Sequence, residues 1–278
     1  MSDTHDFLTA LPDRSVIAIT GPEAKSFLQR VITRGPDDLA DGGAEFSALL
    51  TPQGKVLADF ILFDDGSGGL FLDAPASETA ALLKRLTLYR LRSDAQIEAR
   101  DDLEVAAARG AGEAELKTVA LAAAPDPRSS ALGLRAVVPA GGPSAEVGGY
   151  HAARIQAGIA EFGADYGPAQ VFSTDVNHDL IEGIDYKKGC FVGQEVASRM
   201  HRKGGVRKRT ILVAVDRPVE SGAPLTLADV EIGAVSSAMH GYALALARVD
   251  RLSKGLEAGG ALKCGGAPAR LITDIGAL

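Results

Sequence analysis

The sequence contains no tryptophan and only two cysteines, Cys190 and Cys264, far apart in the chain. Zinc ligands and redox-active cysteine pairs are usually separated by a few residues, and these two cysteines form no CxxC or other zinc-type spacing. A disulfide scaffold is not expected, because a chain of 278 residues can bury a core of its own. We therefore expect two reduced thiols in a cytoplasmic protein. Cys264, between apolar residues and glycines, is predicted to be structural.

Several other signals are missing. The net charge is −7 and the pI is about 5.3, without the basic excess typical of nucleic-acid-binding proteins. No apolar run approaches the roughly 20 residues that span a bilayer, and the first residues, MSDTHDFLTALPDRS, lack the apolar core of a signal peptide. P-loop, GxGxxG, GxSxG and HExxH motifs are absent. We expect partners other than nucleic acids and membranes.

Residues up to about 200 mix helix and strand patterns. A strand over 16–19 leads into apolar residues at 24, 27, 28, 31 and 32, spaced as on one face of a helix. Strands over 46–50 and 56–63 flank the turn TPQG (51–54). Further helices are expected over about 75–89 and 150–160. Short strands are expected around Ile97, Val105, Val119 and Val137.

The pattern changes after RKGGVRKR (202–209). From Thr210 the chain has only short β-type runs, such as ILVAV and YALALA, divided by turn residues. That pattern is typical of a small barrel or sandwich. The sequence therefore predicts an α+β region over residues 1–205, followed by a β-barrel domain over residues 206–278.

Asp59 is the charged residue inside an otherwise apolar strand, VLADFILF (56–63). Because both alternating faces of this strand are apolar, both are expected to be covered. A buried carboxylate must be paired or hydrogen-bonded, since leaving it bare costs several kcal/mol. Two interpretations are open: a structural carboxylate satisfied by backbone amides, and a carboxylate that faces a ligand.

The surroundings of Cys190 differ from those of a core cysteine. Its segment, DYKKGCFVGQEVASRM (185–200), places lysines, glycines, an amide and an acid around the thiol. Apolar residues at 192, 196 and 200 predict a short helix that begins near residue 191 or 192, which would put Cys190 at a helix N-terminus, where the thiolate is favoured. A buried core cysteine is the alternative. The lysines and glycines favour a partly exposed thiol that is reactive or binds metal.

A basic run that includes Arg199, Arg202 and Lys203 follows the cysteine. Such runs are usually a solvated face. The alternative is an anion site, or a docking face for an acidic partner. His201 could form a nucleophile pair with Cys190, although the sequence supplies no third group for it.

The segment KGCFVGQE (188–195) resembles the signature K-G-C-[FY]-x-G-Q-E of the YgfZ-type folate-binding proteins, relatives of the glycine-cleavage T-protein, an aminomethyltransferase. TPQGKVLADF (51–60) resembles the N-terminal motif of that family. GVRKR (205–209) resembles the family's exit from the cysteine segment, and GAVSSAMHGYALALARVDRL (233–252) its barrel motif. The four motifs occur in the order of the family and span most of the chain.

The resemblance implies the T-protein fold, in which two intertwined α+β subdomains and a C-terminal β-barrel surround a central folate-binding channel. It also implies a role in the assembly or repair of iron–sulfur enzymes. Tetrahydrofolate, or a one-carbon derivative of it, would be the cofactor. Folate and iron–sulfur assembly or client proteins would be the partners.

The resemblance makes Cys190 the functional thiol. The residues that would support it are Lys188, Gly189, Gly193, Gln194 and Glu195. Thiolates are natural ligands of iron–sulfur clusters. Cys190 would therefore be a ligand of a transient cluster, and a partner or a small thiol would supply the other ligands.

The resemblance places the folate contacts at Asp59, Asp175, Asn177 and Arg199. Family members commonly have P-x-E-A-x-L upstream of the signature. Here the corresponding stretch is STDVNH (173–178), with the shorter Asp175 in place of the glutamate. T-proteins tend to have two adjacent acids where this chain has Ala58 and Asp59.

Three functions are therefore open. The leading one is a folate-dependent accessory factor for iron–sulfur proteins. The second is a folate-dependent aminomethyl or one-carbon transferase, with Asp59 as the group that activates the pterin. The third is a non-catalytic assembly chaperone that retains only the fold. The residues do not decide whether the protein is an enzyme.

Overall fold

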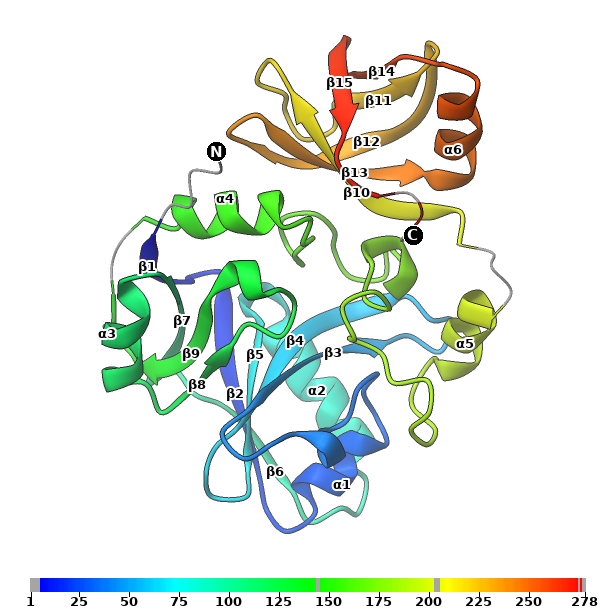
Figure 1. Cartoon of the computed structure of the whole chain (residues 1–278). Helices are drawn as coiled ribbons and strands as arrows, with labels where there is room; N and C mark the ends of the chain where they lie inside the picture. The colour runs from blue at the N-terminus through cyan, green and yellow to red at the C-terminus, as the bar shows by residue number, and fades with distance from the viewer. Residues whose placement is uncertain (1–5, 144–145, 203–205, 275, 277–278) are drawn as a thin grey trace.

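The computed structural model describes residues 6–143, 146–202, 206–274 and 276, and it shows an α+β body next to a barrel (Figure 1). The strands of the body are β1 (Phe7–Ala10), β2 (Arg14–Thr20), β3 (Ala44–Leu50), β4 (Val56–Asp64), β5 (Leu70–Pro75), β6 (Gln96–Ala99), β7 (Leu103–Arg109), β8 (Ala122–Pro125) and β9 (Leu134–Pro139). Its helices are α1 (Ala24–Gln29), α2 (Thr79–Arg90), α3 (Gly112–Val119), α4 (Gly148–Gln156) and α5 (Gln194–Arg202). Short 3-10 turns are η1 (Pro36–Asp38), η2 (Ala76–Glu78), η3 (Ser130–Leu132) and η4 (Ser173–Val176).

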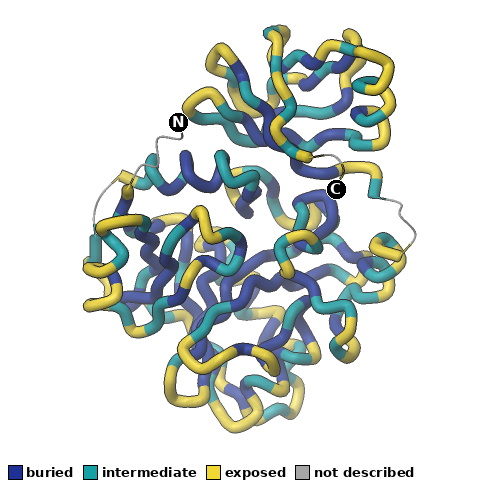
Figure 2. Tube along the Cα trace, in the orientation of Figure 1, coloured by how far each residue is buried: buried dark blue, intermediate teal, exposed yellow. Residues whose placement is uncertain are grey.

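The strands of the body form two antiparallel sheets. One has the order β3-β4-β5-β2-β6 and the other the order β1-β7-β9-β8. Alternate residues of β2 explain how both faces of the larger sheet are buried: Ile17 and Ile19 belong to the core under α1 and α2, whereas Val16 and Ala18 belong to the core shared with the smaller sheet. Figure 2 shows most strands of the body buried, whereas β6 and many connecting loops are exposed.

The C-terminal part is a closed barrel in the order β10-β13-β12-β11-β14-β15. Its elements are β10 (Lys208–Val215), β11 (Pro224–Leu227), β12 (Val230–Met239), β13 (Tyr242–Arg248), α6 (Val249–Glu257), β14 (Leu262–Cys264) and β15 (Ala267–Leu271). Closure leaves no free strand edge. Cys264 is fully buried in the barrel core, which confirms its structural role, and β12 and β13 lie beside α4 (Figure 1).

Two predicted elements were wrong. Val119 ends helix α3 instead of lying in a strand, because the preceding GEAELKT has strong helix formers and the next strand starts only at Ala122. The C-terminal part also contains a helix, α6, whose Leu252 and Leu256 pack on the barrel core. These two leucines have helical spacing, but the helix was not predicted because short β-type runs surround it.

Candidate functional site

Cys190 is exposed in the loop formed by residues 185–193, here called the cysteine loop. Backbone contacts fix both ends of this loop: the Asp185 amide donates to the Thr33 carbonyl at 3.0 Å, and the Val192 amide to the Val31 carbonyl at 3.4 Å. Phe191, next to the thiol, is buried in a core cluster that joins β3, β4 and α5. The thiol is therefore exposed on a loop that is held in place, which confirms the expected accessibility.

The helix after the cysteine begins later than predicted. It starts at Gln194, so Cys190 is outside it and the expected helix N-terminus at the thiol is wrong. The reason is Gly193, whose φ of +81° is incompatible with a right-handed helix. Cys190 therefore lies four residues before the first residue of the helix.

Two glycines join the cysteine loop to the turn TPQG. A Cβ atom on Gly193 would lie 2.5 Å from the Thr51 carbonyl oxygen and 2.9 Å from the Leu50 Cβ atom. On the other side of the contact, Gly54 has a φ of +80°, and a Cβ atom there would lie 3.0 Å from the Val196 side chain. Gly189, in contrast, has open space around it. Two of the motifs noted in the sequence therefore pack directly against each other.

Lys188 anchors the loop to helix α1. Its ammonium donates to the Gln29 carbonyl and lies 5.2 Å from the centre of the Phe191 ring. Partial burial lowers the pKa of this lysine to about 8, against the opposing effect of Asp185 and Asp37. At pH 7 the group is still mostly charged, and it adds positive charge to the loop that carries the thiol.

Helix α5 carries the remaining residues of the predicted site. Gln194 is half-buried, whereas Glu195, Arg199 and Arg202 are exposed. The His201 ring stacks on Tyr186 with 4.1 Å between ring centroids. Lys203 lies outside the described residues.

Asp59 is buried and engaged by protein groups on both oxygens. Its Oδ1 atom lies 3.4 Å from the Arg14 guanidinium, and its Oδ2 atom accepts a hydrogen bond from the Tyr166 hydroxyl. The same hydroxyl lies 3.0 Å from Nε2 of His178. The burial predicted for this carboxylate is confirmed. Its partners are side chains rather than the backbone amides of the structural interpretation.

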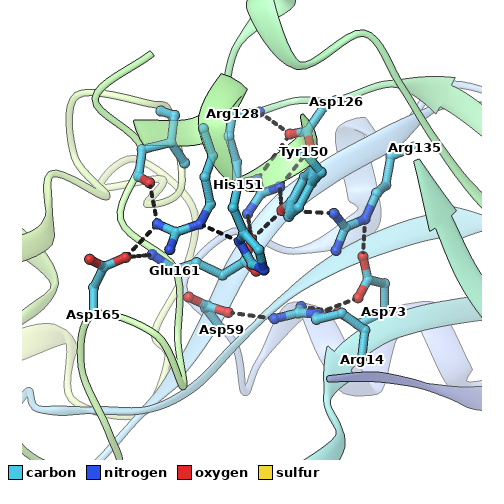
Figure 3. A network of polar contacts seen from close by, with 12 residues as sticks. Arg14, Asp59, Asp73, Asp126, Arg128, Arg135, Tyr150, His151, Glu161 and Asp165 are labelled. Atoms are coloured by element: carbon cyan, nitrogen blue, oxygen red, sulfur yellow. Dashed lines mark hydrogen bonds and ion pairs between the residues drawn. The ribbon is translucent and has the colours of Figure 1, made fainter. Parts of the chain in front are cut away.

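Asp59 belongs to a larger network of buried charges (Figure 3). Arg14 contacts Asp73 on β5 at 2.6 Å, and Asp73 in turn contacts Arg135 on β9 at 2.7 Å. Arg135 donates to the Tyr150 hydroxyl at 2.9 Å. The same hydroxyl donates to the Glu161 carboxylate. Its members, here called the charged cluster, are Arg14, Asp59, Asp73, Asp126, Arg128, Arg135, Tyr150, His151, Arg154, Glu161, Asp165, Tyr166 and His178. The network joins the two sheets to α4.

Burial and pairing shift the pKa values of this cluster. Burial alone would raise the pKa of Glu161, but Arg128, Arg135 and Arg154 together hold it well below its usual range. Burial lowers the pKa of His178 to about 4, so its ring is neutral at pH 7. Nη2 of Arg135 and Nδ1 of His178 find no hydrogen-bond partner among the described residues.

Sequence reasoning found only Asp59 of this cluster. A signal for others was present, because Asp73 in LFLDAP and Arg135 in LRAVVP are also charges inside apolar strands. Pairing them requires contacts between residues far apart in the chain, such as Arg14 with Asp73. No local pattern encodes such a pairing.

Asp175 and Asn177 have structural contacts at η4. The Asp175 carboxylate accepts from the Phe172 amide at 2.9 Å, and burial raises its pKa. Asn177 adopts a left-handed conformation with φ of 62°, and its side-chain amide donates to the Thr210 carbonyl of the barrel at 2.8 Å. Asn177 also lines a cavity of about 430 Å³, together with Ile159, Leu180 and Leu212 among others.

The four positions expected to contact folate have different surroundings. Asp59 is inside the charged cluster, Asp175 caps η4, Asn177 lines the cavity, and Arg199 is exposed on α5. Asp59 is 3% exposed and paired with Arg14 and Tyr166, so it does not face an open site for a pterin.

Among the described residues, no group of three or more His, Cys, Asp or Glu side chains is arranged to hold a metal ion. No helix among these residues has the length and apolar character needed to span a membrane.

Comparison with known proteins identifies the family. Residues 207–274 match the C-terminal β-barrel domain of CAF17. The human mitochondrial iron–sulfur cluster assembly factor IBA57 is 30% identical over 273 residues, which cover 88% of this chain and 75% of the human protein. The chain belongs to the IBA57 family. A Neurospora crassa IBA57 homologue is 31% identical over 236 residues, but these span only 54% of its own length and 76% of this chain.

The fold of this IBA57-family chain is that of the T-protein. The Bartonella henselae glycine-cleavage aminomethyltransferase T superposes with a TM-score of 0.75, covering 99% of this chain and 86% of that one, at 19% identity. The predicted T-protein-like α+β fold with a C-terminal barrel is confirmed. The expected cytoplasmic location is wrong, because the IBA57 relatives are named as mitochondrial proteins.

Proposed function

We propose that this protein is an accessory factor for the assembly or repair of iron–sulfur clusters and that it acts through Cys190. The observation that carries the proposal is an exposed thiol on a loop whose neighbours are fixed: Phe191 is buried and Gly193 is wedged against the TPQG turn. Family membership supports it, since the human and mouse relatives are named iron–sulfur cluster assembly factors.

One thiolate can supply only one cluster ligand. Because the described residues hold no metal-binding group of three or more side chains, we infer that the other ligands come from a partner or a small thiol. The positive charge of Lys188 in the same loop would favour an anionic cluster. The cluster is therefore cargo that the protein holds transiently.

The test is complementation of a strain that lacks this gene. Cys190→Ala should fail to restore the activity of iron–sulfur enzymes although the variant accumulates normally. Cys264→Ala is the matched control, and it should restore that activity as long as it folds. Full activity with Cys190→Ala would instead favour the non-catalytic chaperone.

We also propose the finer, YgfZ-type property, binding of tetrahydrofolate or a one-carbon derivative, at the cavity beside Asn177. Its volume of about 430 Å³ lies within the range of small-molecule sites. The cysteine motif motivates this proposal. Asp59 does not support it, because its side chain is buried and already paired with Arg14 and Tyr166. The same burial leaves the transferase alternative without an accessible carboxylate at this position.

Calorimetric titration with tetrahydrofolate tests the cavity. Leu180→Trp should fill it and weaken binding at least about 10-fold, which corresponds to about 1.4 kcal/mol. Val230→Trp, on the exposed barrel surface, should bind like the parent. If Asp59→Asn weakens tetrahydrofolate binding and Leu180→Trp does not, the pterin binds at Asp59 and the transferase alternative is favoured.

A further inference from the structure

The turn that ends helix α2 holds a leucine in a conformation suited to glycine. Leu91 has φ of 53° and ψ of −106°, and the Ser93 amide donates to the Arg90 carbonyl at 2.9 Å. These are the features of a type II′ turn with Leu91 at its first central position, where glycine dominates. A leucine here costs conformational free energy that nothing in the turn itself recovers.

Leu91 is also the most exposed large apolar side chain among the described residues, at 83%, and Leu88 follows at 69%. The opposite face of α2 is buried through Leu82 and Leu86. Leu88 and Leu91 line an open groove of about 770 Å³, and Leu91 also borders a second groove of about 610 Å³ together with Tyr89. Large apolar side chains gathered on a surface mark interaction sites.

The two grooves have a basic rim. Their lining contains five cations: Arg30, Lys84, Arg85, Arg90 and Arg92. The acid that lines them is Glu23, whose carboxylate already accepts from the Asp94 amide at 2.6 Å. In a chain with a net charge of −7, this local excess of positive charge favours an acidic partner.

The grooves adjoin the cysteine loop through three consecutive residues at the end of α1. Gln29 and Val31 accept hydrogen bonds from the loop, from Lys188 and Val192. Arg30, between them, donates to Ser93 in the strained turn at 3.1 Å. A partner on the grooves would therefore lie next to the segment that anchors the loop of Cys190.

We propose that this surface, formed by Leu88, Leu91 and the basic rim, docks an acidic amphipathic segment of a partner protein. Apolar side chains of the partner occupy the grooves on both sides of Leu91, and its acids face the arginines. The strained turn keeps the Leu91 side chain exposed, so that the partner can contact it. That such a partner then works at Cys190 rests on the proposed function, whereas the docking itself does not.

Fluorescence anisotropy with a synthetic helical peptide, leucines on one face and glutamates on the other, tests the docking. Leu91→Gly relieves the turn, so the variant should melt at or above the temperature of the parent, yet bind the peptide at least about 10-fold more weakly. Arg85→Glu with Arg92→Glu should weaken binding as well, most at low salt. Val230→Ser, at an exposed barrel position, and Cys190→Ser should bind like the parent, which separates docking from the function of the thiol.

Three results would overturn the proposal. They are failure of the parent to bind the peptide, unchanged binding by Leu91→Gly, and preference for vesicles of phosphatidylglycerol that is lost in Leu91→Gly. The last would make the surface a membrane contact instead.

Discussion

The two cysteines show how position in the fold decides what a thiol can do. Cys264 is fully buried in the barrel, and burial raises its pKa. Cys190 is exposed on an anchored loop. Because the thiolate is the nucleophile and the metal ligand, only Cys190 is available for chemistry with another molecule.

Brief alkylation of the folded protein with iodoacetamide, read by mass spectrometry, checks this difference. Cys190 should be labelled at least about 10-fold faster than Cys264, because the reagent can reach Cys264 only when the barrel core opens. Faster labelling of Cys264 would contradict the account.

Asp59 is a second case in which surroundings decide the role. In Asp59→Asn, a neutral amide replaces the acceptor of Arg14 and Tyr166, and we expect the free energy of unfolding to fall by about 2–3 kcal/mol. Urea unfolding measures this change in the free energy of unfolding. Asp250→Asn, in an exposed pair with Arg248, is the control and should change little. A fully stable Asp59→Asn would show that the carboxylate is not structural.

The neutral His178 makes stability depend on pH. Its pKa in the folded protein, about 4, is below the 6.5 of an unfolded histidine, so the unfolded chain takes up a proton first as the pH falls. The parent should therefore lose about 2 kcal/mol from this group between pH 7 and pH 5. Urea unfolding at both pH values should show a smaller loss in His178→Gln than in the parent. Equal losses in parent and His178→Gln would refute the assignment.

At the scale of elements, the cysteine loop shows what a local pattern can and cannot predict. Apolar spacing correctly predicted a helix after the cysteine, because Val196 and Ala197 pack inward on the body. It missed the start at Gln194, because Gly193 is set by contact with Thr51, a residue remote in sequence. The turn at Leu91 was also not predictable from a local pattern, because its backbone conformation is one that glycine usually adopts.

The two glycines of the loop provide a matched test. Gly193→Ala adds a Cβ atom 2.5 Å from the Thr51 oxygen at a φ of +81°, and it should lower the free energy of unfolding by about 2 kcal/mol or more. Gly189→Ala enters open space and should cost less than about 1 kcal/mol. Thermal and urea unfolding compare the two. Equal stability would mean that the loop and the TPQG turn do not pack as described.

At the scale of the whole molecule, contacts between distant residues hold the parts together. Arg209 of β10 forms a two-point ion pair with Asp179 at 2.7 and 2.8 Å, and Arg154 of α4 contacts Ser237 of β12 at 3.1 Å. The strands, the barrel and the motif at Cys190 could be predicted from local spacing and resemblance. The charged cluster could not, because its pairs, such as Arg14 with Asp73, join residues that only the finished fold brings together.

The central claim is that Cys190 supplies a ligand to a transient iron–sulfur cluster. Anaerobic reconstitution of the full chain with ferric iron, sulfide and glutathione, followed by visible absorption, tests it most directly. The parent and Cys264→Ala should stabilise a cluster, with glutathione supplying the remaining thiolates, whereas Cys190→Ala should not. Formation of the same cluster by Cys190→Ala, or of none by the parent, would contradict the claim.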